Sequence, residues 1–419
     1  MSLYFSSDKA RGNLRSLEES GNMTANRIAI FLPSLNGGGA ERVMVTLANA
    51  FARRGYAVDL VLAAAQGPYL KNVGPDVRVV DLKAGRVIRA LLPLARYLRQ
   101  ERPAVMLVAM THANVIALLA RMLARAPTRL VLSERSTISV EYDRAQGLAA
   151  RIVYTLVPRL YTRADGIVAV SHAAAADFVR FSALPSRAVA VIYNPFEIDH
   201  IQTRAAETTA HPWFEPGQPP VVLAIGRLND AKDYPTLIRA FDQLRAARPL
   251  RLLILGEGEL RGTLEALVAE CGLTTDDVQM PGFVANPFAY LARCGVFVLS
   301  SRYEGLPGAL IEAMACGAPV VSTDCPSGPR EILEGGRWGV LVPVGDVEVL
   351  ARAIDNALST PRSQLPDVRR RAADFEQGKA VDAYLKALGL QPQRMAEASG
   401  NESGKTPEKD IASLNPSRR

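Results

Sequence analysis

The 419-residue chain lacks the cysteine patterns and apolar runs that are typical of secreted or membrane-spanning proteins. Its four cysteines, Cys271, Cys294, Cys316 and Cys325, include no Cys-x-x-Cys pair, so we expect reduced thiols that bind no metal. No apolar run reaches the roughly 18 to 20 residues that span a bilayer. Residues 1–26 are polar and do not resemble a signal peptide. These absences predict a cytosolic protein, either soluble or peripheral to a membrane.

Aromatic residues and acidic metal-binding motifs are also scarce. Phe, Trp and Tyr make up 6% of the chain, and no run of Arg and Lys is interleaved with them, which argues against nucleic-acid binding. No Asp-x-Asp motif offers a chelate for Mg²⁺ or Mn²⁺. Cations are in excess, however, with a formal net charge of +7. This charge predicts affinity for acidic lipid headgroups or for a phosphorylated substrate.

Strands and helices alternate along most of the chain, which predicts doubly wound parallel sheets. The length and the 48% apolar content suit two domains better than one core. The composition shifts to Thr, Ala, Glu and Pro after residue 197, and both ends of the chain are polar without a period. We expect a disordered leader (1–26), a first Rossmann-like domain (27–196), a linker (197–219), a second such domain (220–367), a terminal helical segment (368–390) and a disordered tail (391–419).

Residues 298–324 carry two carboxylates within an apolar unit. A strand is followed by a loop, by a short helix that Pro307 opens and Gly317 closes, and by a second strand. Glu304 lies in the loop and Glu312 in the helix. Their oxygens suit the vicinal hydroxyls of a ribose or a hexose. The alternative is that Glu304 caps the helix and Glu312 is solvated.

The same half of the chain offers groups that bind anions. The amides of Gly305, Leu306 and Gly308, at the expected helix N-terminus, suit a phosphate or sugar oxygen. Arg227 and Lys232 follow an earlier strand. Two cations at such a strand edge can neutralise a pyrophosphate.

The first half places glycines and a histidine at strand ends. Gly38 and Gly39 follow the first strand, and their amides are open to a ligand unless the loop is only a flexible connector. Arg42 stands where a dinucleotide fingerprint has its third glycine, which argues against that motif. His112 follows strand 104–110 at the edge where open α/β sheets bind ligands, although a lone histidine is often structural.

Two basic amphipathic segments also lie in the first half. We expect helices over 86–103, interrupted at Pro93, and over 147–165. Either they are packed surface helices with solvated arginines, or they bind a membrane surface. The first segment carries Arg86, Arg89, Arg96 and Arg99.

Two motifs of the second half resemble a known family. GRLNDAK (226–232) and Glu304-x7-Glu312 with EAMACGAPVVSTD (312–324) closely resemble the retaining nucleotide-sugar glycosyltransferases of family four, the glycosyl transferases group 1. The resemblance extends from about residue 27 to residue 388. It implies the GT-B fold, in which two Rossmann-like domains face each other across a cleft that holds the site. It also implies that the terminal helix crosses back onto the first domain.

The resemblance implies roles for these residues. Glu304 contacts the donor sugar and Glu312 the ribose hydroxyls, while the two cations bind the diphosphate without a metal or other cofactor. The implied donor-site residues are Gly38, Gly39, His112, Arg227, Lys232, Phe283, Val284, Glu304, Gly305, Leu306 and Glu312, with Phe283 and Val284 beside the nucleobase. Glu134 and Arg135 either contact the acceptor or pair with each other. For Ser171, an N-cap role is the simplest interpretation.

The implied reaction moves a hexose or N-acetylhexosamine from a nucleotide-diphosphate sugar, expected to be a UDP-sugar, with retention of configuration. TDCPSGPREIL (323–333) resembles transferases that build bacterial surface glycans. We therefore expect a glycan or lipid-linked acceptor, polysaccharide or lipopolysaccharide synthesis, and a peripheral location at the inner face of the plasma membrane. The alternatives are a nucleotide-sugar epimerase and a non-catalytic nucleotide-sugar-binding module of the same fold.

Overall fold

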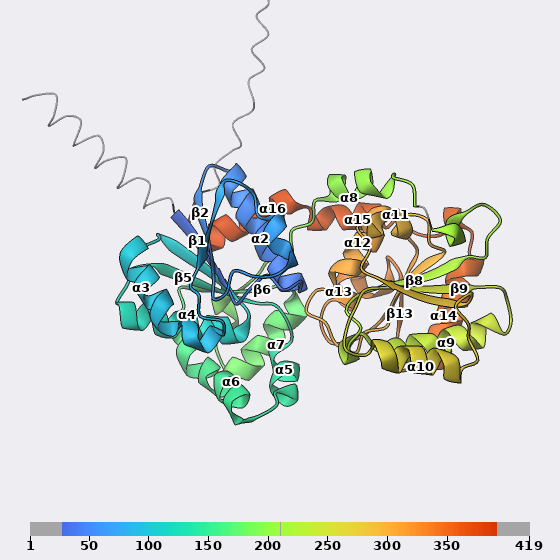
Figure 1. The fold of residues 1–419 in the computed structure, drawn as a ribbon, viewed down its shortest axis with the longest axis horizontal. Coiled ribbons are helices and arrows are strands. Elements are labelled where there is room, and N and C mark those ends of the chain that lie inside the picture. The colour runs from blue at the N-terminus through green and yellow to red at the C-terminus, as the bar shows by residue number, and fades with distance from the viewer. Residues whose placement is uncertain (1–26, 210, 392–419) are drawn as a thin grey trace, which may run out of the picture.

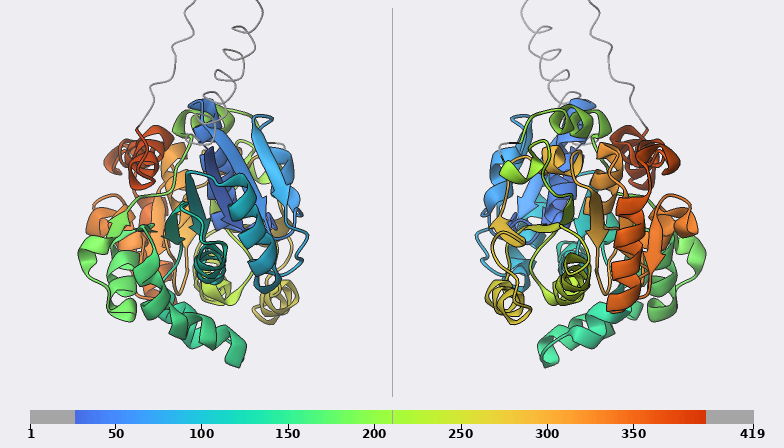
Figure 2. Two further views of the ribbon diagram at one scale, coloured as in Figure 1. Left: turned by 90° about the vertical axis from the view of Figure 1, so that its left-hand side faces the viewer. Right: turned by 90° about the vertical axis from the view of Figure 1, so that its right-hand side faces the viewer.

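The computed structural model describes residues 27–209 and 211–391 and shows two α/β domains side by side (Figure 1). The expectations for the leader over 1–26 and for the tail beyond residue 391 lie outside these residues. Each domain is built on one parallel sheet, as the alternation of strands and helices predicts. Helices lie on both faces of each sheet (Figure 2).

The first sheet has seven strands in the order β3-β2-β1-β4-β5-β6-β7, all paired in parallel. The order reverses between β1 and β4. The strands are β1 (Arg27–Leu32), β2 (Ala57–Leu62), β3 (Val77–Asp81), β4 (Val105–Ala109), β5 (Arg129–Glu134), β6 (Gly166–Ala169) and β7 (Val189–Val191). The helices are α2 (Gly39–Arg53), α3 (Leu91–Glu101), α4 (Thr111–Ala124), α5 (Ile138–Arg144), α6 (Leu148–Leu160) and α7 (His172–Ser182).

The second sheet has six parallel strands in the order β10-β9-β8-β11-β12-β13 and reverses between β8 and β11. The strands are β8 (Val221–Ile225), β9 (Arg251–Leu255), β10 (Val278–Gly282), β11 (Val296–Leu299), β12 (Val320–Thr323) and β13 (Val340–Val342). The helices are α8 (Ile198–Ala205), α9 (Tyr234–Arg245), α10 (Arg261–Glu270), α11 (Pro287–Leu291), α12 (Gly308–Cys316), α13 (Pro329–Ile332) and α14 (Val347–Ser359).

The central strands are apolar along their whole length because both faces of the sheet are covered. In β1, Ile28, Ile30 and Leu32 belong to the core on one face, and Ala29 and Phe31 to the core on the other. This division follows from the two-residue period of a strand. Continuous apolar runs are therefore the sequence pattern of a buried parallel sheet.

Two segments differ from the sequence-based expectations. The stretch 197–219, expected as a linker, contains α8, whose Ile198 and Ile201 belong to the second-domain core. Its polar composition reflects the solvent-facing side of a packed helix. Pro93 does not interrupt a helix, because α3 begins only at Leu91. Proline is tolerated in a first turn, where its missing N–H would have no partner within the helix.

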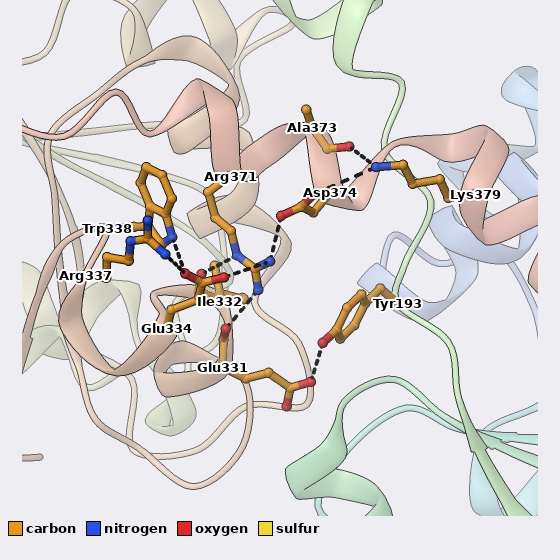
Figure 3. A network of polar contacts seen from close by, with 10 residues as sticks. All are labelled: Tyr193, Glu331, Ile332, Glu334, Arg337, Trp338, Arg371, Ala373, Asp374 and Lys379. Atoms are coloured by element: carbon orange, nitrogen blue, oxygen red, sulfur yellow. Dashed lines mark hydrogen bonds and ion pairs between the residues drawn. The ribbon is translucent and has the colours of Figure 1, made fainter.

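The C-terminal segment joins the two domains. Helix α15 (Arg369–Ala372) packs against α12, and a break at Glu376, with ψ near 142°, redirects the chain into α16 (Gln377–Ala387). Arg371 donates to the carbonyls of Glu331 and Ile332 at 3.0 Å each and fixes α15 to the second domain (Figure 3). Helix α16 then contacts α2 of the first domain.

The side chain of Leu385, fully buried in the first-domain core, tests how far this domain depends on the C-terminal helix. We expect Leu385→Ala to lower the free energy of unfolding by about 2 to 5 kcal/mol, because it leaves a cavity in a packed core. Urea denaturation measures the change. Lys386→Ala, at the exposed neighbouring position, serves as control. Equal losses in the two variants would contradict the packing role.

Candidate active site

Several of the residues singled out from the sequence lie next to the two points where strand order reverses. Gly38 follows β1, and His112 lies in the first turn of α4, directly after β4. In the second domain Arg227 and Lys232 follow β8, and Glu304 follows β11. Open parallel sheets bind ligands at such switch points, because the loops of the two strands diverge there.

Lys232 and Glu304 form an ion pair in the second domain. The Nζ atom of Lys232 lies 2.6 Å from Oε1 of Glu304, and the Ser301 hydroxyl donates to the same oxygen at 2.7 Å. The exposed fractions of the lysine and glutamate side chains are 19% and 14%. Because β8 and β11 are paired neighbours, their loops meet at one strand edge.

Glu312 pairs with an arginine of the first domain. Its Oε1 lies 2.9 Å from Nη1 of Arg42, in the first turn of α2, and its side chain is only 8% exposed. Helix α12 begins after Pro307 without a side-chain cap. The alternative in which Glu304 caps this helix and Glu312 is solvated is therefore wrong. Both carboxylates are largely buried, and buried charges require partners.

The end of β8 leaves no room for a side chain beside Lys232. A Cβ atom on Gly226 would lie 2.8 Å from Cε of Lys232 and 2.9 Å from the Tyr234 hydroxyl. That hydroxyl is buried and has no hydrogen-bond partner within residues 27–209 and 211–391. Burial raises the pKa of Tyr234, and the charge of Glu304 raises it further. The Tyr234 hydroxyl therefore stays protonated beside the ion pair.

Two further donor-site candidates of the second domain, Arg227 and Phe283, are exposed, whereas Gly305 and Leu306 are buried. The Nε–H of Arg227 donates to Glu259 at 3.1 Å, and its side chain is 71% exposed. Phe283 follows β10 and is 80% exposed. Its neighbour Val284 packs against the domain core. Arg227 and Phe283 therefore offer a cation and an aromatic face to solvent.

The glycine-rich loop of the first domain is partly occupied by its own helix. Gly38 is the N-cap residue of α2, and a Cβ atom there would lie 2.1 Å from a carboxylate oxygen of Glu41. Burial raises the pKa of Glu41, while hydrogen bonds from the amides of Glu41 and Gly38 lower it. The carboxylate of Glu41 thus lies against Gly38, where the sequence predicts an amide open to a ligand. At Gly39, by contrast, no other atom of the described residues comes within 4 Å of an added Cβ atom.

Glu134 and Arg135 do not pair with each other. Glu134 is buried and accepts hydrogen bonds from Thr111 at 3.0 Å, from Asn114 at 2.9 Å and from Tyr161. Arg135 donates instead to other side chains, those of Asn194 and Tyr384. The alternative that Glu134 and Arg135 pair with each other is therefore wrong, and a contact of these residues with the acceptor stays a prediction. Glu134 anchors the start of α4.

His112 is exposed at this start of α4. Desolvation by the protein on one side of its ring lowers the pKa of His112. Across the part of the chain that the structure describes, no hydrogen bond or ion pair joins it to Lys232 or Glu304. Ser171, as expected, is the N-cap of α7 and accepts from the amide of Ala174.

Comparison with known proteins places this geometry in a family. A model described as Glycosyltransferase Family 4 matches residues 37–200, and one described as Glycosyl transferases group 1 matches residues 219–360. A Campylobacter jejuni relative, named N-acetylgalactosamine-N,N'-diacetylbacillosaminyl-diphospho-undecaprenol 4-alpha-N-acetylgalactosaminyltransferase, is 30% identical over 385 residues, covering 86% of this chain and 99% of the relative. The chain belongs to this family of glycosyltransferases.

Further relatives and solved structures agree with this assignment. The glycosyltransferase is 29% identical over 367 residues to LpsE of Rhizobium meliloti, a lipopolysaccharide core biosynthesis glycosyltransferase, covering 85% of this chain and 97% of LpsE. It matches Anabaena Alr3699/HepE in complex with UDP-glucose with a TM-score of 0.72 at 21% identity, over 87% of this chain and 99% of that one. Sucrose-phosphate synthase from Thermosynechococcus elongatus matches with a TM-score of 0.74 at 21% identity, over 87% and 98% of the two chains. The fold is GT-B.

The structure adds residues of the glycosyltransferase that sequence analysis missed. The sequence shows Arg42 only as a residue that breaks a glycine pattern, and nothing local in the sequence points to its partner Glu312. Ser301 and Tyr234 lie beside the ion pair of Lys232. The contact of Glu41 with Gly38 had a detectable pattern, because a glutamate three residues after an N-cap is typical of a capping box.

The buried carboxyl group of Glu134 predicts a pH dependence of stability. Burial raises its pKa to about 7 from its ordinary value of 4.5, and the charge of Glu141 adds to the rise. Its contribution to stability is complete below pH 4.5 and is lost as the pH rises through 7. Between these values we expect wild type to lose on the order of 1 to 3 kcal/mol relative to Glu134→Gln in urea unfolding. Glu270→Gln, at an exposed position of α10, is the control. If the free energies of unfolding of wild type and Glu134→Gln changed with pH in parallel, the prediction would be wrong.

Proposed function

We propose that this glycosyltransferase moves a hexose or N-acetylhexosamine from a UDP-sugar, with retention of configuration, to a lipid-linked glycan acceptor. The product serves bacterial surface polysaccharide or lipopolysaccharide synthesis at the inner face of the plasma membrane. The observation that carries the proposal is the contact between Lys232 and Glu304 at the switch point of the second domain. There a cation for a phosphate and a carboxylate for sugar hydroxyls lie side by side.

The chemistry follows from the hydrogen-bonding capacity of these groups. An ammonium group has three donors, so Lys232 can keep Glu304 and also bind an oxygen of the donor diphosphate. This links the position of the sugar to the position of its leaving group. Glu312, held by Arg42, is the acceptor for the ribose hydroxyls. Arg227 and Phe283, both exposed, are the contacts for the diphosphate and the nucleobase.

For the transfer step we propose attack from the face that the diphosphate leaves. The bond between the anomeric carbon and the phosphate oxygen breaks as the bond to the acceptor oxygen forms, and the acceptor proton passes to the leaving phosphate. Glu304 then holds the sugar and does not attack it. Lys232, Arg227 and the amides at the start of α12 stabilise the charge of the departing diphosphate. The reaction is proposed to need no metal.

The lipid-linked acceptor is supported by the name of the Campylobacter jejuni relative, which contains a diphospho-undecaprenol. It is also supported by the surface of the first domain. Leu148 and Ile152 of α6 are 77% and 47% exposed, and Arg151 lies between them in sequence. In the 3₁₀ turn Val87–Ala90 and at the start of α3, Ile88 and Leu92 are 68% and 65% exposed.

These exposed side chains suit a peripheral contact with lipid. Apolar side chains beside cations are typical of segments that lie in a membrane interface. The α5–α6 segment, in teal-green, extends from the lower edge of the molecule (Figure 2). None of the helices over 27–209 and 211–391 is long and apolar enough to cross a bilayer. We propose that α3 and α6 rest on the anionic leaflet from which the acceptor is taken.

Titration with UDP and turnover of UDP-N-acetylgalactosamine test the donor site. We expect Glu312→Gln to weaken UDP binding by about 1.5 to 3 kcal/mol, because the ribose belongs to donor and product alike. Glu304→Gln should lower kcat while UDP affinity changes little. Lys232→Ala should both weaken UDP binding and lower kcat. Glu348→Gln, with a 78% exposed side chain, is the control.

The outcomes of this experiment separate the candidate functions. Release of UDP by wild type supports a transferase, and a change of sugar configuration without release supports an epimerase. Binding without either reaction supports a non-catalytic module. Similar behaviour of Glu304→Gln and Glu312→Gln would contradict the division of roles.

Co-sedimentation with vesicles tests the membrane contact. We expect binding to vesicles with anionic lipid but not to neutral ones, and loss of binding at high salt, since each surface cation contributes about 1 kcal/mol. Arg89→Glu with Arg151→Glu should abolish it, whereas Arg239→Glu, on the exposed side of α9, should not. Equal binding of both variants would point to a different surface, and no binding at low salt would favour a soluble acceptor.

A further inference from the structure

The loop that carries Glu304 is held from the opposite domain. The hydroxyl of Thr137 donates to the carbonyl of Glu304 at 3.0 Å, and the hydroxyl of Ser171 donates to the carbonyl of Gly305 at 3.1 Å. Thr137 precedes α5, just after β5, and Ser171 caps α7, just after β6. Two consecutive carbonyls of the second domain thus rest on hydroxyls at the carboxyl edge of the first sheet.

These contacts are shielded from water. The side chains of Thr137, Ser171 and Ser327 belong to residues that are at most 8% exposed. Ser327, of the second domain, also donates to the carbonyl of Gly305 at 2.7 Å and lies 2.7 Å from the Ser171 hydroxyl. A hydrogen bond in such surroundings is stronger than one in water, and losing it leaves a buried carbonyl without that partner.

Contact with the first domain also explains why residue 305 is a glycine. A Cβ atom there would lie 2.1 Å from the carbonyl oxygen of Arg135 and 3.1 Å from Cα of Ser136. The three nearest atoms all belong to the first domain. Gly305 is not among the residues with positive φ, so its backbone conformation is open to alanine. The glycine is required by the approach of the first domain and not by the shape of its own loop.

A third contact joins Arg144 of the first domain to residues near Glu304 and Lys232. Arg144, at the end of α5, donates to the Tyr303 hydroxyl at 2.8 Å and stacks on that ring, 4.6 Å from its centroid. It also pairs with Asp230, in the 3₁₀ turn that carries Lys232. These side chains are about half exposed, so this pair contributes less than the buried hydroxyls.

We propose that Thr137 and Ser171 are positioning residues for sugar transfer. By fixing the carbonyls of Glu304 and Gly305, they set the direction of the Glu304 carboxylate only when the first domain is docked on the loop. The nucleoside diphosphate needs groups of the second domain and binds without this contact, whereas transfer requires it. The inference rests on the proposed sugar-binding role of Glu304. Small errors of orientation at a reacting centre have large effects on rate.

Thr137→Val tests the proposal, because valine keeps the shape of threonine and the side chain does not cap α5. We expect kcat with UDP-N-acetylgalactosamine to fall ten- to a hundredfold, while the Kd for UDP changes less than twofold. Thr137→Ser should restore most of the rate. Thr203→Val, which removes a hydroxyl bonded to the carbonyl of Asp199 within α8, is the matched control. A wild-type kcat in Thr137→Val would overturn the proposal.

A second measurement does not depend on turnover. Hydrogen exchange of the amides of residues 300–307 should be faster in Thr137→Val than in wild type and unchanged in Thr203→Val. If wild type turns over no nucleotide sugar, the proposed function fails, yet this comparison still decides whether the first domain orders the loop. Equal exchange in all three proteins would overturn the positioning role.

Gly305→Ala tests the approach of the domains directly. The added methyl group meets only the first domain at close range, so we expect a larger radius of gyration in small-angle X-ray scattering and a lower kcat, with little change in UDP affinity. Gly262→Ala is the matched control, because nothing lies within 4 Å of a Cβ atom added at this exposed position of α10. An unchanged radius of gyration with normal turnover would contradict the required close approach.

Discussion

The reversal of strand order in each parallel sheet is the constraint on which the site depends. Loops of neighbouring strands diverge only where the order reverses, so the strand ends of β8 and β11 are left open to a ligand. Lys232 and Glu304 follow these two strands and meet there. The first sheet repeats the arrangement at β1 and β4. A site of this kind needs both sheets to present their carboxyl edges to each other, which the contact of Thr137 with Glu304 shows.

Contacts at the back of the interface keep the two domains in this relation. Glu331 accepts hydrogen bonds from the Tyr193 hydroxyl at 2.7 Å and from the amide of His172. Its own carbonyl is held by Arg371 beside the break that leads into α16 (Figure 3). The connecting chain, the C-terminal segment and α7 thus converge on one element of the second domain. The contacts near Glu304 then act on domains that are already tethered.

The ion pairs of the candidate site contribute little to stability. A largely buried ion pair adds little net free energy, because the loss of hydration offsets the Coulomb attraction. The two carboxylates, Glu304 paired with Lys232 and Glu312 paired with Arg42, nevertheless lie in one apolar unit, residues 298–324. Groups fixed in this way need no reorganisation when charge develops in a reaction. Such preorganised groups stabilise the charge of a transition state most effectively.

Local chemistry in the sequence determined the elements and the kinds of groups at the site: buried apolar strands, glycines at strand ends, and the positions of Arg227, Lys232, Glu304 and Glu312. These follow from periodicity and from short motifs, which need no distant partner. Pairings between distant segments, such as Arg42 with Glu312 or Thr137 with Glu304, were decided by the tertiary structure alone. The tertiary structure also decided the helix within 197–219, because its apolar side chains are buried only by packing against α11 and α12. Such contacts depend on the docking of one sheet edge against another. No local sequence pattern encodes this docking, because the contacting residues are far apart in the chain.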